Sequence, residues 1–411
     1  MTIVCKIISL FTFYLFMIFS VQAQDPVVVG YFPEWGIYDR NYHIADIPAN
    51  KLTHVIYAFA KISTSGEVEL FDSYAATDKA YPGDTWDEHL RGNFKQLKIL
   101  KKKYPHLKTL IAIGGWTLSD PFTDVALTQE SRRKFATSAV NFMCKYDFDG
   151  LDIDWEYPVG GGIAKGRPED KKNFTLLIAE LRNQLTILEE NTNRKYLLTV
   201  ASSAGDALNN YELNHVAQYI DWYNLMTYDF HGSWEQTTNH QAPLYPTSLD
   251  SSPLAPRYHI LYAVNSYIQA GVAPSKIVLG IPLYSRGWAG VGRENGGFLQ
   301  PAKGPCKGTW EPGVVDYKEL YKKIQEQPNE YLLYRDEEAK TSWIYNPYEE
   351  GGVFYTYEDV ETVKEKVKFI KNQNLRGAMF WEFSSDLRET DHPHSIVNVV
   401  NQALLSDKKV R

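Results

Sequence analysis

The stretch FDGLDIDWEYP occupies residues Phe148–Pro158 and carries four acidic side chains, Asp149, Asp152, Asp154 and Glu156. Three of the four fall on every second position of an otherwise apolar sequence. Alternate side chains of a β-strand lie on the same face, so Asp152, Asp154 and Glu156 are expected to point in one direction. The stretch therefore predicts a buried strand with apolar side chains on one face and three carboxyl groups on the other.

Seven further apolar, β-rich runs surround this strand in the sequence. With it they make eight candidate strands: Val27–Phe32, Leu52–Phe59, Lys108–Gly115, Phe148–Glu156, Tyr196–Ser202, Ile220–Asp229, Ile277–Tyr284 and Arg376–Phe383. Near-continuous hydrophobic runs are typical of parallel strands that are buried on both faces. Amphipathic stretches separate most of them: Gly92–Tyr104, Glu130–Lys145, Pro168–Glu189, Arg257–Gln269, Glu358–Asn372 and Ser395–Leu405. Eight strands alternating with helices predict an α/β protein with a (β/α)8 barrel, or TIM barrel.

One connection is too long for a simple barrel loop. Between Tyr284 and Glu358 lie short strand-like pieces and a helical patch near Tyr317–Gln325. Structureless loops of that length are uncommon in compact domains. We therefore expect a small α+β insertion domain at residues 286–356, between the seventh and eighth strands, with the barrel formed by residues 24–285 and 357–411.

The N-terminus has the pattern of a secretory leader. Lys6 provides a positive charge, an apolar stretch follows from Ile7 to Val21, and small residues precede a cleavage point near Ala23. A membrane anchor is the alternative, but the apolar run is shorter than the roughly 20 residues that a bilayer span needs. We expect residues 1–23 to be a signal peptide and the protein to be secreted and extracellular.

Composition narrows the classes of partner. The net charge of −7 argues against a nucleic-acid or anionic-membrane surface, where a basic balance is expected. Aromatic residues make up 14% of the chain, as in proteins that stack on flat ligands, although large cores also use aromatic side chains. Cys144 and Cys306 are left after removal of the leader, and they could pair or stay free. Metal-ligand spacing is absent, so we expect no metal. We also expect no cofactor and a monomer.

The three carboxyl groups of the acidic strand predict acid–base chemistry. Same-face residues are about 6.6 Å apart along a strand, so the carboxyl tips can approach hydrogen-bonding distance. Like charges that close cannot all ionise, so at least one pKa rises, as a general acid requires. A salt-bridge ladder or a metal site would need cations that the strand does not supply. The intervening side chains should pack outward against the helices: Leu151, Ile153 and Trp155.

Asp149, Asp152, Asp154 and Glu156 in DGLDIDWEYP resemble the DxxDxDxE signature of the family 18 glycoside hydrolases, the chitinase family. The stretches IAIGGWTLSDPF, MTYDFHGSW, GIPLYSRGW and GAMFWEF resemble the motifs of that family's third, sixth, seventh and eighth strands, and GTWEPGVVDY resembles the insertion of its bacterial and fungal branch. The resemblance implies retaining, substrate-assisted hydrolysis of chitin and chito-oligosaccharides, with Glu156 as general acid and base.

The resemblance also implies roles for other residues. Asp154 would hold the substrate's acetamido nitrogen, Asp152 would share a proton with it, and Tyr228 would donate a hydrogen bond to the acetamido carbonyl. Substrate contacts are implied for Trp381, Trp116, Trp35, Tyr31, Phe122, Met226, Asp229, Tyr284, Arg286 and Glu311. Three residues belong to structural motifs, namely Asp149, Gly114 and Gly115, and we interpret His231 as structural too.

One position departs from the family pattern. Many relatives carry serine two residues before the glycine pair of the third strand, where this chain has Ala112. In those relatives the serine, together with the tyrosine at the position of Tyr31, stabilises the buried aspartate. We expect the change to alter the proton sharing of Asp152 and to shift the pH optimum without abolishing activity.

Two other functions are compatible with the same barrel. Chitin-binding lectins of this type usually lose the catalytic glutamate, which is present here as Glu156. Endo-β-N-acetylglucosaminidases that act on N-glycans usually lack the large insertion, which should deepen the cleft around a linear polymer. The sequence favours a secreted chitinase over both.

Overall fold

The computed structural model describes residues 25–85 and 87–405. Eight parallel strands form a closed barrel: β1 (Val27–Pro33), β2 (His54–Ile62), β4 (Lys108–Gly114), β5 (Gly150–Asp154), β6 (Leu197–Ser203), β7 (Trp222–Met226), β8 (Ile277–Pro282) and β15 (Gly377–Trp381). They are hydrogen-bonded in the order β1-β15-β8-β7-β6-β5-β4-β2, and pairing of β1 with β2 closes the ring. The short strand β3 (Val68–Leu70) adds to β2 in antiparallel orientation. The predicted (β/α)8 barrel is confirmed.

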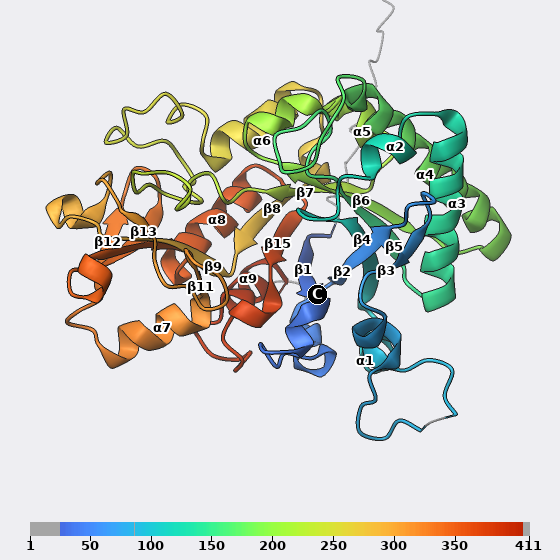
Figure 1. Ribbon diagram of the computed structural model, residues 1–411, viewed down its shortest axis with the longest axis horizontal. Helices are drawn as coiled ribbons and strands as arrows, with labels where there is room; N and C mark the ends of the chain where they lie inside the picture. The colour runs from blue at the N-terminus through green and yellow to red at the C-terminus, as the bar shows by residue number, and fades with distance from the viewer. Residues whose placement is uncertain (1–24, 86, 406–411) are drawn as a thin grey trace, which may run out of the picture.

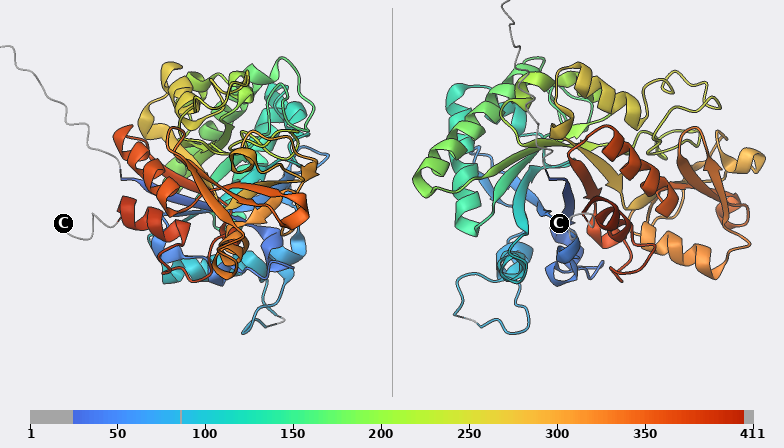
Figure 2. Two further views of the ribbon diagram at one scale, coloured as in Figure 1. Left: turned by 90° about the vertical axis from the view of Figure 1, so that its left-hand side faces the viewer. Right: turned by 180° about the vertical axis from the view of Figure 1, so that it is seen from behind.

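Helices surround the barrel, as Figures 1 and 2 show. They are α1 (Gly92–Lys103), α2 (Phe122–Val125), α3 (Gln129–Tyr146), α4 (Asp170–Thr192), α5 (Leu213–Ala217), α6 (Ile260–Gln269), α8 (Val360–Asn372) and α9 (Ile396–Leu405). Their ends follow local chemistry. The hydroxyl of Thr128 caps the N-terminus of α3, and Asp147 ends that helix in the left-handed conformation with φ 63°. The carboxylate of Asp359 caps α8 in the same way.

The two faces of β5 bury different kinds of side chain. Leu151, Ile153 and Trp155 belong to the hydrophobic layer between barrel and helices, which also contains Phe135 of α3 and Phe174 of α4. A separate apolar cluster fills the barrel interior, with members such as Val29, Ile56, Leu110, Val278 and Met379. The alternation predicted from the sequence is therefore confirmed, and the carboxyl groups of β5 face the interior.

A second sheet follows β8 directly. Its strands are β9 (Tyr284–Ala289), β10 (Gly304–Pro305), β11 (Val314–Asp316), β12 (Leu332–Asp336), β13 (Thr341–Asn346) and β14 (Val353–Tyr357), accompanied by helix α7 (Tyr317–Glu326). They pair antiparallel in the order β10-β9-β14-β13-β12, with β11 also on β9. In Figure 1 this sheet lies to the left of the barrel. The sheet spans residues 284–357, slightly more than the 286–356 expected for the insertion.

Two barrel strands are shorter than predicted. The runs Phe148–Glu156 and Ile220–Asp229 read as strands, but β5 ends at Asp154 and β7 at Met226. Beyond β7 the backbone forms a local hydrogen bond, from the N–H of Thr227 to the carbonyl of Leu225. The residues after each strand end therefore lie in loops at the mouth of the barrel, where active sites of this fold lie.

We expect Ile153→Ala to destabilise the protein by about 2–5 kcal/mol, because it leaves a cavity in a fully buried layer. The measurement is the free energy of unfolding in urea. Ile187→Ala is the matched control, because Ile187 is exposed on α4 and its loss should change stability by about 0.5 kcal/mol or less. Equal effects of the two substitutions would contradict the assignment of faces on β5.

Candidate active site

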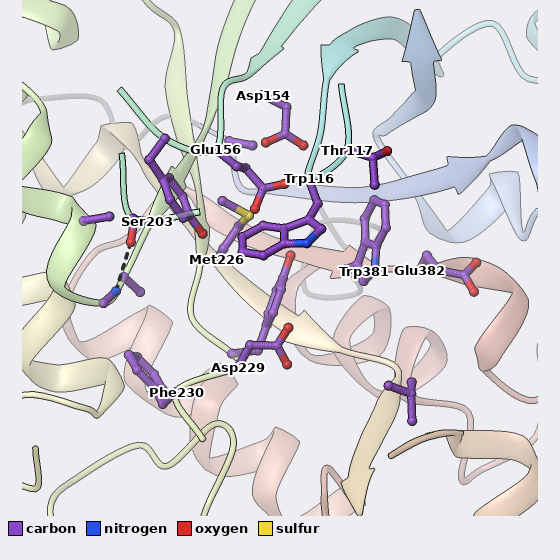
Figure 3. Close-up of a pocket in the computed structure, with 18 of the residues that line it drawn as sticks. Trp116, Thr117, Asp154, Glu156, Ser203, Met226, Asp229, Phe230, Trp381 and Glu382 are labelled. Carbon is purple, nitrogen blue, oxygen red and sulfur yellow. Dashed lines mark hydrogen bonds between the residues drawn. The ribbon is translucent and has the colours of Figure 1, made fainter. Parts of the chain in front are cut away.

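A cleft of about 1420 Å³ opens at the C-terminal ends of the barrel strands. The last residues of β5, β6, β7 and β15 line it, namely Asp154, Ser203, Met226 and Trp381. The second sheet contributes one wall through residues such as Arg286 and Glu311. Figure 3 shows the acidic and aromatic side chains that lie in this cleft.

Asp152 is fully buried at the base of the site and is held by three neutral donors. The hydroxyl of Tyr31 donates to Oδ2 at 2.7 Å, the hydroxyl of Thr199 donates to Oδ1 at 2.5 Å, and the amide of Asn224 donates to Oδ1 at 3.1 Å. Burial raises the pKa of Asp152, and these three hydrogen bonds lower it without cancelling the rise. The carboxyl group can therefore hold either charge state without a cation beside it.

The structure explains how the site accommodates Ala112. This residue lies directly beside Asp152 in the β4–β5 register, and its methyl group offers no hydrogen bond. Thr199 on β6 and Asn224 on β7 supply donors from the other side of Asp152. Sequence reasoning missed both residues. The available signal was a polar residue in the middle of each of two mostly apolar strand runs.

Asp154 ends β5, and Glu156 follows it two residues later, close enough for its charge to act on Asp154. Among the described residues, Asp154 Oδ1 is buried and has no hydrogen-bond partner. Burial raises the pKa of Asp154 well above its usual value, and the charges of Glu156 and Asp152 raise it further. Burial also raises the pKa of Glu156 to about 7; a hydrogen bond from Tyr157 opposes this and the charge of Asp229 adds to it. Glu156 can thus carry a proton near neutral pH, as a general acid does.

Aromatic rings form the floor of the cleft around Trp381. Its ring stacks on Phe59 at 5.9 Å, meets the edge of Tyr31 at 5.4 Å and lies 6.4 Å from Trp35. Trp116 follows β4 and is 47% exposed, so a large part of its ring is available to a ligand. All five residues line the cleft, and Phe59 is the one that the sequence did not single out.

Asp229 and Arg286 bind each other across the cleft wall. The guanidinium donates to the two carboxylate oxygens at 2.7 and 2.6 Å. It also lies over the rings of Trp234 and Tyr284, at 5.0 and 5.4 Å. Burial lowers the pKa of Arg286, but Asp229, with smaller effects of Tyr284 and Glu311, brings it above its usual value, so the guanidinium stays charged. Trp234, which is 59% exposed and lines the cleft, is a further residue that sequence reasoning missed.

The prediction for Phe122 is wrong. Its side chain is fully buried, stacks on Trp155 at 5.3 Å and meets the edge of Phe135 at 5.9 Å. Burial of this apolar ring in the layer between barrel and helices is more favourable in free energy than its exposure at the cleft mouth. The other implied contact residues line the cleft: Tyr31, Trp35, Trp116, Met226, Asp229, Tyr284, Arg286, Glu311 and Trp381, as do Asp154, Glu156 and Tyr228.

The motif residues around the site have structural contacts. Asp149 precedes β5, accepts a hydrogen bond from the N–H of Thr109 at 2.8 Å and pairs with Lys101 at 3.0 Å. Gly114 has φ 108°, and a side chain there would meet the carbonyl oxygen of Asp154 at 2.2 Å. Gly115 is also left-handed, with φ 91°. These glycines let the β4 loop approach the end of β5.

Other candidate reactive groups lie outside the cleft. His231 is buried and its Nδ1 lies 2.8 Å from a carboxylate oxygen of Glu235, which fits the structural interpretation. Cys144 and Cys306 are both free. Within residues 25–85 and 87–405, no three His, Cys, Asp or Glu side chains are grouped so that they could hold a metal ion.

Carboxyl groups in a cleft, one of them able to carry a proton near neutral pH, are features of glycoside hydrolase active sites. The profile of "Glycosyl hydrolases family 18" matches residues 27–386, and the chain belongs to this family. Chitinase A1 of Niallia circulans is 40% identical over 409 residues, which cover 90% of this chain and 58% of the relative. Endochitinase 1 of Metarhizium robertsii is 38% identical over 378 residues, 90% of this chain and 84% of the relative.

Solved structures agree with the family assignment. The structure of chitinase ChiA74 from Bacillus thuringiensis superimposes with a TM-score of 0.85 at 39% identity, over 93% of this chain and 70% of that one. The catalytic domain of psychrophilic chitinase B from Arthrobacter TAD20 gives a TM-score of 0.84 at 29% identity, over 93% of this chain and 95% of that one. The fold and the barrel therefore match those of family 18 chitinases.

The raised pKa of Glu156 makes stability depend on pH. The folded-state pKa of about 7 exceeds the usual value, so folding favours the protonated form, and this stabilisation is lost as the pH rises through about 7. We expect Glu156→Gln to be more stable than wild type by on the order of 2 kcal/mol near pH 8, and the difference to vanish near pH 4. Urea unfolding of both proteins across this range measures it. A difference that does not change with pH would contradict the prediction.

Proposed function

We propose that the protein is a chitinase that hydrolyses β-1,4 linkages between N-acetylglucosamine units. The observation that carries the proposal is the position of Glu156: an acid with a pKa of about 7 lies in an aromatic-floored cleft, next to Asp154. The similarity to proteins named chitinase and endochitinase supports chitin as the substrate. The buried Oδ1 of Asp154, which has no hydrogen-bond partner among the described residues, supports a ligand with a hydrogen-bond donor, as an acetamido N–H is.

The mechanism that we propose is retaining and uses the substrate as nucleophile. Glu156 donates its proton to the glycosidic oxygen while the substrate's 2-acetamido oxygen attacks the anomeric carbon. Asp154 holds the acetamido N–H and stabilises the positive charge of the oxazolinium intermediate, and Tyr228 donates to the acetamido carbonyl. Asp152 shares a proton with Asp154. The deprotonated Glu156 then takes a proton from water, which attacks and restores the β-anomer.

The substrate follows from this chemistry. A sugar without a 2-acetamido group offers no nucleophile at the reacting unit, so cellulose should not be cleaved. The walls of the cleft include the second sheet, which suits a linear chain better than the branched glycan of a glycoprotein. A chitin-binding lectin on the same barrel is the second candidate, and only the activity test separates it from an enzyme.

The first test is Glu156→Gln. We expect wild-type protein to release chitobiose from colloidal chitin and the variant to release less than about one thousandth as much, because both proton transfers are lost. Product is measured by chromatography of soluble sugars. Glu190→Gln on the exposed surface of α4 is the control and should keep full activity. Wild-type protein that binds chitin but releases nothing would replace the chitinase proposal with the lectin.

The second test reads the anomeric configuration of the product. Proton NMR during the first minutes of chito-oligosaccharide hydrolysis should show the β-anomer in excess, which then mutarotates. Oligomers of fully deacetylated glucosamine are the matched control and should remain intact. Initial formation of the α-anomer, or cleavage of the deacetylated oligomers, would contradict the substrate-assisted mechanism.

Secretion and a monomeric state stay predictions from the sequence. The expected signal peptide, residues 1–23, lies outside the described residues. Of the helices within residues 25–85 and 87–405, none combines the length and apolar character needed to cross a membrane.

A further inference from the structure

The hydroxyl of Ser119 lies where two functional loops meet. It accepts a hydrogen bond from the backbone N–H of Glu156 at 2.9 Å. It lies 2.8 Å from the carbonyl oxygen of Gly115 and 3.2 Å from that of Asp154, and its single hydrogen can be donated to either. Ser119 is 1% exposed, so water does not compete for these contacts.

The Glu156 backbone depends on this side chain because it lies outside the sheet. Strand β5 ends at Asp154, so the N–H of Glu156 is not part of the barrel's hydrogen-bond ladder. Ser119 Oγ is the acceptor for that N–H. A buried N–H that loses its acceptor is costly, and a chain segment can avoid the cost by turning toward water.

The hydrogen bond between Ser119 and Glu156 also connects Glu156 to the turn that carries the exposed Trp116. Ser119 ends the turn that follows β4 and carries Trp116, and the N–H of Gly115 in this turn donates to the carbonyl of Asp154 at 2.7 Å. A side chain at Gly162 would lie 2.5 Å from the carbonyl oxygen of Glu156 and 3.1 Å from the ring of Trp116. The backbone of Glu156 and the ring of Trp116 are therefore parts of one tightly packed unit.

We propose that Ser119 is a positioning residue for the catalytic acid, and that its hydroxyl fixes the backbone of Glu156 relative to the Trp116 loop. The inference rests on the proposed function of Glu156. Ser119 does not line the cleft, so it acts through Glu156 and not on the substrate.

Loss of the hydroxyl should change the surroundings of Glu156 in a defined direction. The charged and titratable groups that act on Glu156, namely Asp154, Asp229, Tyr157, Tyr211 and Tyr228, are unchanged by a substitution at position 119. Burial is the largest cause of the raised pKa of Glu156. A segment that turns toward water hydrates the carboxyl group, so its pKa should fall toward the usual value.

The test compares Ser119→Ala, Ser119→Cys and Ser138→Ala. We expect Ser119→Ala to lower kcat on chito-oligosaccharides by about 10- to 100-fold, because the acid is displaced from the glycosidic oxygen. The basic limb of its pH–rate profile should move to lower pH. Ser119→Cys retains a weak hydrogen-bonding group and should be intermediate. The hydroxyl of Ser138, on α3, accepts a hydrogen bond from the N–H of Val68 at 2.8 Å, and Ser138 does not line the cleft. Ser138→Ala is therefore a matched control that should have normal kcat and a normal pH profile.

A second measurement does not require activity. The pH-dependent difference in unfolding free energy between wild type and Glu156→Gln reports the pKa of Glu156. We expect this difference to shrink when both proteins also carry Ser119→Ala, and to persist when both carry Ser138→Ala. An unchanged difference, together with a kcat and pH profile equal to those of Ser138→Ala, would overturn the inference. Wild-type protein without activity would overturn the proposed function instead, and the unfolding measurement would still decide the role of Ser119.

Discussion

The burial of a carboxyl group without a cation is the constraint on which the site depends. Asp152 sits fully buried inside the barrel, and Tyr31, Thr199 and Asn224 satisfy its oxygens with neutral donors. A lysine or arginine there would hold Asp152 permanently ionised, so Asp152 could no longer take up and release a proton. Neutral donors leave the charge state of the three carboxyl groups adjustable, which is what repeated proton transfer requires. The three donors come from β1, β6 and β7, so they can reach one carboxyl group only when the strands close into a barrel.

The sequence predicted those features that depend on local periodicity. All eight barrel strands were expected because strands buried on both faces are continuous apolar runs, and the two-residue period placed Asp152 and Asp154 inside. The strand ends were harder to predict, because Glu156 continues the alternation of acidic and apolar residues after β5 has ended, and Tyr228 continues a β-rich run after β7 has ended. The roles of Thr199, Asn224, Phe59 and Trp234 depend on which strands and loops become neighbours, and no local pattern carries that information. Phe122 was placed wrongly for the same reason: its motif lies near the cleft, but its ring packs into the helix layer.

The second sheet contributes to the site through charged contacts that cross between segments distant in sequence. Arg286 on β9 binds Asp229, which follows β7. Arg40, from the loop after β1, bonds Glu382 at 3.0 Å and lies 3.5 Å from Asp316 of the second sheet. All five residues line the cleft, so the groups that shape its wall also attach the insertion to the barrel. Stability of the wall and shape of the binding surface are therefore set by the same residues.

Strand β9 begins two residues after β8 ends, and the intervening Leu283 donates to the carbonyl of Trp381 while its own carbonyl accepts the N–H of Tyr317. No linker separates the wall of the cleft from the strand that supports it. The wall lacks a hinge at this junction, so closure of a separate domain over the substrate is not available there. A polysaccharide chain meets a groove that is already formed, and the entropy lost on binding falls mainly on the sugar chain. Under the proposed mechanism, a wall fixed at this junction leaves the distortion toward the transition state to the sugar ring.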